Sequence, residues 1–214
     1  MIEGLYVITD QELHPGRTHL MIAQAAIEGG ARLIQIRDKT ASDREFYEAA
    51  VAIRELCRQA GALFFVNDRV HVAVAVGADG VNIGQSDLPI SIVRDILGEK
   101  AIVGVSCDCI EQAIQAEKDG ADYIGYGPVF ATATKLDAGP VSGLVALRTV
   151  CEAVNIPVVA IGGIDLSNIH QIADAGAKSA AVISAVVRAE NMKQTVIELI
   201  RRYGTRNLRG ADGS

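Results

Sequence analysis

The chain has 214 residues, of which 50% are hydrophobic and 21% are charged, and its formal net charge is −6. This composition can bury a large core, which excludes a disordered chain and a fibrous repeat. The acidic balance, 4% aromatic residues and the absence of tryptophan exclude the basic footprint and the stacking platforms of nucleic-acid binding. A phosphate group would therefore have to be met by local backbone amides, a few placed cations or a metal.

Four cysteines are scattered along the chain without a C-x-x-C pair, which indicates small buried thiols in a reduced compartment. They are Cys57, Cys107, Cys109 and Cys151. Glu3 and Asp10 interrupt the opening segment, so we expect no secretory signal there. No apolar run reaches the roughly 18 residues that a membrane span needs. We expect a cytoplasmic protein without membrane or nucleic-acid partners, and its oligomeric state stays open.

Short apolar segments alternate with amphipathic segments from end to end. The predicted strands span residues 5–9, 33–36, 63–66, 80–83, 102–105, 123–126, 158–161 and 179–183. The predicted helices span residues 19–28, 42–60, 70–76, 90–97, 110–119, 144–154, 166–175 and 191–202. This alternation predicts a parallel sheet and, over residues 1–203, a single-domain α/β fold, the (β/α)8 TIM barrel. Residues 204–214 are rich in glycine and polar residues and are expected to form a disordered tail.

Glycine-containing turns of similar sequence precede four of these strands, at residues 29–31, 76–79, 119–122 and 175–177. Each is typical of a helix that ends at a glycine and turns tightly into a strand at the lower end of a barrel. A doubly wound open sheet is the main alternative. Its dinucleotide-binding form is disfavoured because no G-x-G-x-x-G follows the first strand.

In such barrels the active site lies at the carboxyl ends of the strands, and polar residues concentrate at those ends in this chain. Gln35, Arg37 and Lys39 occupy alternate positions and can share one face. Gln35 also lies inside an apolar run, where an uncommitted polar side chain is costly to bury. Solvated charge at a strand end is the alternative interpretation of this triplet.

Asp68 and Asp87 close the third and fourth predicted strands. Two carboxylates in this place suit Mg²⁺, which uses one or two carboxylates and keeps positions for water and substrate phosphate. The alternative is that one or both cap the following helix. Asp87 in particular precedes Leu88-Pro89 and is a good N-cap candidate.

The long segment after the sixth strand contains Thr132, Thr134 and Lys135, which could bind an anion and close over a substrate. The seventh strand ends in Gly162-Gly163 and the eighth in Ile183-Ser184. Loops at these two ends form the commonest phosphate site of this fold, from backbone amides and a helix N-terminus.

Five motifs at the expected strand ends resemble, in order, those of thiamine-phosphate synthase. They are Gln35-Ile36-Arg37-Asp38-Lys39, Val66-Asn67-Asp68-Arg69, Gly84-Gln85-Ser86-Asp87-Leu88-Pro89, Thr132-Ala133-Thr134-Lys135 and Ala160-Ile161-Gly162-Gly163-Ile164. The resemblance covers nearly the whole chain, from Tyr6 to Ser184.

The resemblance implies a transferase that joins hydroxymethylpyrimidine diphosphate to thiazole phosphate, or to its carboxylate form, releasing diphosphate and making thiamine phosphate. The residues implied for the pyrimidine diphosphate are Gln35, Arg37, Lys39, Asn67, Ser106 and Lys135. Those implied for the thiazole phosphate are Thr132, Thr134, Gly163, Ile183 and Ser184. Asp68 and Asp87 would hold Mg²⁺, and catalysis would fall to Lys135, Arg37, Lys39 and Ser106. The expected chemistry is a Mg²⁺-assisted dissociative substitution without a covalent enzyme intermediate.

The chain departs from the family pattern at three positions. Asn82 and Asp108 stand where histidines are common, and Leu136 replaces the proline that usually follows the loop lysine. Asp108 is the most serious departure, because it adds negative charge near a site for polyanions. A thiazole tautomerase on a similar barrel, a non-catalytic phosphate sensor and another phosphate-binding barrel isomerase are the alternative functions.

Overall fold

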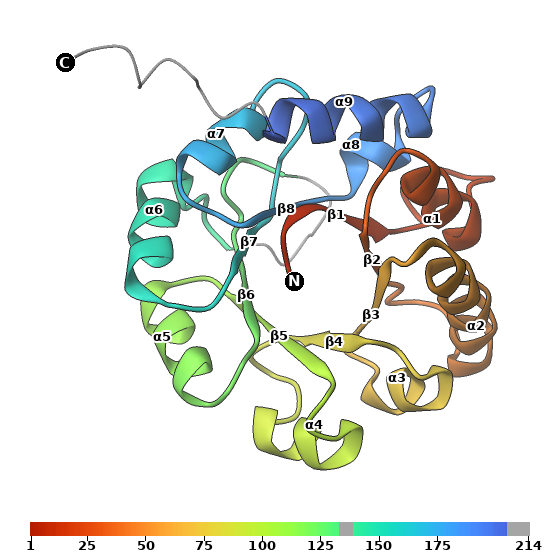
Figure 1. Cartoon of the computed structure of the whole chain (residues 1–214), viewed down its shortest axis with the longest axis horizontal. Coiled ribbons are helices and arrows are strands. Elements are labelled where there is room, and N and C mark those ends of the chain that lie inside the picture. Colours follow the sequence, from red (N-terminus) through yellow and green to blue (C-terminus); the bar gives the residue numbers. More distant parts are fainter. Residues whose placement is uncertain (133–138, 205–214) are drawn as a thin grey trace.

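Eight parallel strands close into one barrel, with the helices on its outside, in a computed structural model that describes residues 1–132 and 139–204 (Figure 1). The strands are β1 (Gly4–Thr9), β2 (Leu33–Ile36), β3 (Leu63–Asn67), β4 (Gly80–Ile83), β5 (Ile102–Cys107), β6 (Tyr123–Tyr126), β7 (Val158–Ala160) and β8 (Ser179–Val182). The helices are α1 (His19–Glu28), α2 (Asp43–Ala60), α3 (Val70–Val76), α4 (Ile90–Leu97), α5 (Ile110–Lys118), α6 (Gly143–Ala153), α7 (Ile169–Asp174), α8 (Ser184–Val187) and α9 (Met192–Gly204).

The first strand closes the barrel because it pairs in parallel on both sides. Tyr6 is in register with Leu33 of β2 and with Ala181 of β8. This closure confirms the predicted (β/α)8 barrel and contradicts the open doubly wound sheet. Among the helices that the structure describes, none has both the length and the apolar character needed to cross a membrane.

Side chains on alternate positions of the strands fill two separate cores. On β1, Tyr6 and Ile8 belong to the core inside the barrel, whereas Leu5 and Val7 belong to the core between the barrel and its helices. Strands that are buried on both faces read as continuous apolar runs, as the sequence does here. The same alternation decides which polar side chains point into the barrel and can reach a site at its mouth.

Local sequence signals set the ends of several elements as predicted. Ser42 caps α2 in a reciprocal capping box, in which the Glu45 backbone N–H donates to Ser42 Oγ at 3.3 Å and Glu45 Oε2 accepts from the Ser42 N–H at 3.0 Å. Gly77 ends α3 in the left-handed conformation, with φ of +60°. The other three glycine turns that the sequence predicts before a strand also contain a glycine with positive φ, at Gly30, Gly120 and Gly176.

The structure differs from the predicted elements mainly around β7 and β8. Helix α7 begins at Ile169 and not near Leu166, because Asp165 Oδ1 accepts hydrogen bonds from the backbone and hydroxyl of Ser167 and holds a turn there. Ser184 does not end a strand. It begins α8, whose four residues are too few for a periodic pattern to reveal. Helix α9 includes Gly204, and the predicted disordered tail from 205 to 214 lies outside the described residues.

Replacing Gly104 with alanine is expected to lower the free energy of unfolding by roughly 1–3 kcal/mol, as overpacking of a core does. A Cβ at Gly104 would overlap the ring of Tyr123, a side chain that is 1% exposed inside the barrel. Urea denaturation measures the change. Gly125→Ala on the neighbouring strand is the matched control, because its added Cβ would meet Asn82 Oδ1 at an ordinary 3.7 Å. Equal stability losses in the two variants would contradict this account of Gly104.

Candidate functional site

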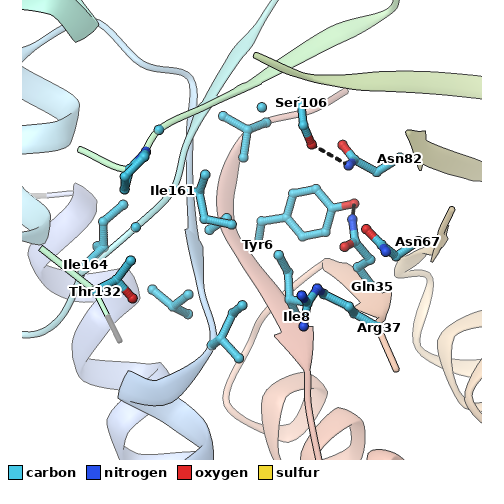
Figure 2. Close-up of a pocket in the computed structure, with 18 of the residues that line it drawn as sticks. Tyr6, Ile8, Gln35, Arg37, Asn67, Asn82, Ser106, Thr132, Ile161 and Ile164 are labelled. Atoms are coloured by element: carbon cyan, nitrogen blue, oxygen red, sulfur yellow. Dashed lines mark hydrogen bonds between the residues drawn. The ribbon is translucent and has the colours of Figure 1, made fainter. Parts of the chain in front are cut away.

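The carboxyl ends of the strands surround a pocket that holds about 1020 Å³ of empty space, including the part open to solvent. Figure 2 shows its polar side chains, among them Gln35, Arg37, Asn67, Asn82 and Ser106, gathered on one side. These come from β2 to β5 or from the residues that directly follow those strands. The β2–β5 half of the pocket therefore carries its amide side chains and Arg37.

The opposite half is formed by the residues after β6, β7 and β8. Thr132 and Ile164 lie there in Figure 2, with Ile161 between the two halves. Gly163, Ile183 and Ser184 also line the pocket. Of the thirteen residues predicted for the site, those that line the pocket in the described part of the chain are Gln35, Arg37, Asn67, Ser106, Thr132, Gly163, Ile183 and Ser184.

Charge at the pocket wall is sparse. Among the described residues that line the pocket, Arg37 is the only basic side chain and Asp108 is the only carboxylate. The Arg37 side chain is 15% exposed, and its Nη1 lies 3.3 Å from Oδ2 of the buried Asp10. A guanidinium held in this way is a fixed positive charge for a phosphate group that enters the pocket.

Alternation along one strand predicts that Lys39 shares a face with Gln35 and Arg37. This prediction is wrong for Lys39, which does not line the pocket. Strand β2 ends at Ile36, and the Lys39 ammonium pairs with Asp68 Oδ2 beside the pocket. The Lys39 side chain is 53% exposed, so this surface pair stabilises the fold little. It brings a second cation close to the end of β3.

Asp68 follows β3 with a left-handed backbone, φ +59°, and is the only described non-glycine residue with positive φ. Its N–H donates to the Asn82 carbonyl at 2.9 Å, which ties it to β4. Backbone strain of this kind concentrates at functional sites. The residue that precedes α3 is Arg69, and α3 has no side-chain cap, so Asp68 does not serve that helix as an N-cap.

The alternative that Asp87 caps α4 is wrong, because Pro89 is the N-cap residue and no side chain caps this helix. Instead, Asp87 Oδ2 accepts a hydrogen bond of 2.7 Å from the Gly84 N–H at the end of β4. Within the described residues no group of three or more His, Cys, Asp or Glu side chains could hold a metal. Mg²⁺ needs only one or two protein carboxylates when substrate phosphates and water supply its other ligands. Two carboxylates on neighbouring strand ends fit this smaller requirement.

The glycine pair after β7 has a packing reason of its own. A Cβ at Gly162 would lie 2.5 Å from Pro128 Cα, and one at Gly163 would lie 2.8 Å from Phe130 Cβ. Both glycines also have positive φ, +98° and +63°. They let the loop after β7 lie against the segment after β6. A larger residue at Gly163 would therefore disturb this packing as well as any phosphate binding.

Ile183 and Ser184 stand where β8 turns into α8. The first N–H groups of a helix have no partner within that helix, and Ser184 begins this one while it lines the pocket. Thr132 is half-buried at the pocket wall. Thr134, Lys135 and Leu136 lie outside the described residues.

A buried cluster that the sequence analysis missed fixes the chain between Arg37 and Lys39. Asp38 accepts hydrogen bonds from the Thr40 and Ala41 N–H groups, both at 2.8 Å, and from His19 Nε2 at 3.1 Å. His19 Nδ1 in turn lies 2.8 Å from Thr9 Oγ1. The only signal in the sequence was an aspartate between two cations within a motif.

Arg69 holds the same loop from the other side. Its Nη2 donates to the Ala41 carbonyl at 2.6 Å, and its guanidinium stacks 4.5 Å from the centroid of the Phe46 ring. Although Arg69 belongs to one of the family motifs, it acts here on the loop that carries Arg37 and Lys39. The arrangement positions those two cations before any ligand arrives.

Asp38→Asn is expected to lower the free energy of unfolding at neutral pH by roughly 2 kcal/mol. Burial raises the pKa of Asp38, but hydrogen bonds from Ala41, His19 and Thr40 outweigh it and lower that pKa from 3.8 to about 2. A lowered pKa stabilises the fold above about pH 4, and this contribution is lost as the pH falls towards 2.

Urea denaturation over this pH range should show the difference between the wild type and Asp38→Asn shrink with falling pH. Asp95→Asn, an exposed change on α4, is the matched control and should leave stability unchanged. A deficit in Asp38→Asn that stays constant down to pH 2 would mean that the charge of Asp38 is not its source.

The prediction of small buried thiols is confirmed for two of the four cysteines. All four are free, Cys57 and Cys107 are buried, and Cys109 and Cys151 are half-buried. Burial raises the pKa of each of the two buried thiols to about 12, so neither forms the reactive thiolate at neutral pH.

Comparison with known proteins identifies the family. Residues 5–186 match the family model described as thiamine monophosphate synthase. The chain is 51% identical over 184 residues to the thiamine-phosphate synthase of Methanospirillum hungatei, covering 86% of this chain and 89% of that protein. It is 48% identical over 195 residues to that of Chloroflexus aurantiacus, covering 91% and 90%.

A solved structure agrees with these matches. The thiamine phosphate pyrophosphorylase of Pyrococcus furiosus superposes with a TM-score of 0.86 at 46% identity, covering 94% of this chain and 95% of that one. The similarity thus extends over both sequence and fold. The chain belongs to the thiamine monophosphate synthase family.

Proposed function

We propose that the pocket binds hydroxymethylpyrimidine diphosphate in its β2–β5 half and thiazole phosphate in its β6–β8 half, and joins the two into thiamine phosphate. As a member of this family, the chain is a thiamine-phosphate synthase, which is a transferase. The observation that carries the substrate assignment is the division of the pocket. The amide side chains, Ser106 and Arg37 lie on one side, and Thr132 with the ends of β7 and β8 lies on the other.

On the pyrimidine side, Gln35, Asn67 and Ser106 would bind the ring and Arg37 would meet the diphosphate. Lys39 stands beside the pocket, where it would reach a diphosphate that extends towards Asp68. From the sequence alone, Lys135 would add a third cation from the segment after β6. Together these charges would stabilise the diphosphate as it leaves and acquires negative charge.

On the thiazole side, Thr132, Thr134 and Ser184 would supply hydroxyl groups, and Gly163 and Ile183 backbone N–H groups, to the phosphate. An anchored phosphate fixes the thiazole nitrogen near the carbon that loses the diphosphate, which turns a reaction between two molecules into one within a single complex. Because the amino group of the pyrimidine can delocalise the positive charge of that carbon, no nucleophilic side chain is required.

Asp68 and Asp87 are the residues that would hold Mg²⁺. When bound, Mg²⁺ supplies positive charge to the diphosphate oxygens and so makes diphosphate a better leaving group. The two carboxylates lie at the ends of adjacent strands, and their described hydrogen bonds and ion pairs use Oδ2 of each. The buried thiols support a further part of the proposal, that the enzyme works in the reducing cytoplasm.

Diphosphate release from the two proposed substrates, measured with and without Mg²⁺, tests this function. We expect release only when both substrates are present, and loss of it when Mg²⁺ is chelated. Thiazole isomerisation without diphosphate release would favour the tautomerase, and tight phosphate binding without turnover would favour the sensor. Either result would overturn the proposal.

A further inference from the structure

Five side chains form a continuous hydrogen-bonded line across the floor of the pocket. Gln35 Nε2 donates to Tyr6 Oη at 2.9 Å, and Tyr6 Oη lies 3.1 Å from Tyr123 Oη. Tyr123 Oη donates to Asn82 Oδ1 at 3.2 Å, and Asn82 Nδ2 donates to Ser106 Oγ at 3.0 Å. All five residues line the pocket, and Figure 2 shows the two ends of the line, at Gln35 and at Ser106.

The orientations of the Gln35 and Asn82 amides set the direction of every bond in this line. A hydroxyl group has one proton, and Tyr123 gives its proton to Asn82, so its oxygen must accept from Tyr6. Tyr6 in turn accepts from Gln35. Burial raises the pKa of both tyrosines above the usual range, so both hydroxyls keep their protons.

This direction fixes what each end offers to a ligand. Ser106 Oγ accepts from Asn82 and therefore has its own proton to donate. At the other end, the Gln35 amide uses its nitrogen in the line, which leaves its carbonyl oxygen as an acceptor. The floor of the pocket thus presents an acceptor at β2 and a donor at β5.

The two ends are also coupled to one another. If the Gln35 amide turns so that its nitrogen faces the ligand, its oxygen needs a proton from Tyr6, and Tyr6 can then no longer donate to Tyr123. All groups are paired again only if the Tyr123 hydroxyl donates to Tyr6 and the Asn82 amide turns. Asn82 Oδ1 then accepts the proton of Ser106, which is no longer available to the ligand. An arrangement that reverses only part of the line leaves buried polar groups unsatisfied, and this is unfavourable.

We propose that this line makes the enzyme selective for an amino-substituted pyrimidine over its oxo-substituted counterpart, with Tyr6, Tyr123 and Asn82 as positioning residues. The proposal rests on the proposed function, which places the pyrimidine in this half of the pocket. An amino group donates to the carbonyl oxygen of Gln35. An oxo group in the same place is an acceptor, so it forces the Gln35 amide to turn and the whole line to reverse.

The test compares binding of two pyrimidines by isothermal titration calorimetry. One probe is 4-amino-2-methyl-5-(phosphooxymethyl)pyrimidine and the other is its 4-oxo counterpart, and neither has a diphosphate to lose. In the wild type we expect the amino compound to bind more tightly. Tyr6→Phe and Tyr123→Phe keep both rings but interrupt the line, so each should reduce the ratio of the two dissociation constants by roughly fivefold to tenfold.

The double variant separates one coupled line from two independent contacts. Because one interruption is enough to free the Gln35 amide, Tyr6→Phe combined with Tyr123→Phe should reduce the ratio no further than either single variant. Tyr203→Phe is the matched control, since its hydroxyl donates to the Ala177 carbonyl at 2.8 Å and does not line the pocket. It should leave the ratio unchanged.

Two results would overturn the proposal while the proposed function stands. In one, the wild type binds both probes with equal affinity. In the other, the line-breaking variants keep the wild-type ratio because both probes lose affinity equally, which is the behaviour of a merely structural contact. If neither probe binds the wild type, the placement of a pyrimidine in this pocket fails, and the selectivity proposal fails with it.

Discussion

Arg37→Ala is expected to lower kcat for thiamine phosphate formation by about 10²–10³-fold, the usual effect of removing one preorganised electrostatic group. Arg37 is the only basic side chain that lines the described pocket, and Asp10 holds it in place. In the role proposed for Arg37, its interaction with the diphosphate is strongest in the transition state, because negative charge grows on the leaving group. KM for the pyrimidine should therefore change less than kcat.

Steady-state kinetics with thiazole phosphate saturating measures both quantities. Arg37→Lys should recover part of the loss, because an ammonium keeps the charge but not the bidentate geometry of a guanidinium. Arg58→Ala removes the same charge from α2, where Arg58 pairs with Glu55, and should change neither constant. If Arg37→Ala raises KM and spares kcat, Arg37 is a ground-state anchor and not a leaving-group activator.

The barrel and the location of its site were predictable because each rests on a local pattern. Apolar runs bounded by glycine turns identify strands, and polar residues such as Asp68 and Ser184 directly follow those runs. Parallel strands then bring their carboxyl ends to one edge of the sheet. That residues from distant parts of the chain meet there can therefore be predicted without knowledge of their individual contacts.

The hydrogen-bonded line from Gln35 to Ser106 could not be predicted in the same way. Tyr6 and Tyr123 lie within apolar strands and read as ordinary core residues. They are 117 positions apart in the chain, and their hydroxyls meet only because the barrel closes. Asn82 was recognisable only as a departure from a family pattern, and its two hydrogen-bonding partners became clear from the structure alone.

Contacts of single side chains account for the other differences. Alternation places Lys39 on the face of Arg37, but the strand ends before it and Lys39 turns to Asp68. The Asp38 cluster depends on His19, which approaches from α1 on the neighbouring unit. Such pairings follow from where neighbouring elements pack, which a periodic pattern does not encode.

Asp68→Asn and Asp87→Asn are each expected to raise the Mg²⁺ concentration needed for half-maximal activity by roughly 10- to 100-fold, a typical cost of damage to a metal site. An amide keeps the shape of the carboxylate but lacks the charge that attracts a hard cation. Both variants should stay folded. Asparagine tolerates the left-handed backbone found at Asp68, and Asp87 is exposed.

The measurement is diphosphate release over a Mg²⁺ titration, with calorimetric Mg²⁺ binding in the presence of diphosphate as the second readout. Asp95→Asn, an exposed change on α4, is the matched control and should keep the wild-type requirement. Lys39→Gln separates the metal from the ion pair at Asp68. If Asp68 serves only to hold Lys39, then Lys39→Gln and Asp68→Asn will lose the same activity and neither will change the Mg²⁺ requirement. That result, together with a normal requirement in Asp87→Asn, would remove Mg²⁺ from the ends of β3 and β4, because two carboxylates that bind the ion must each alter its affinity.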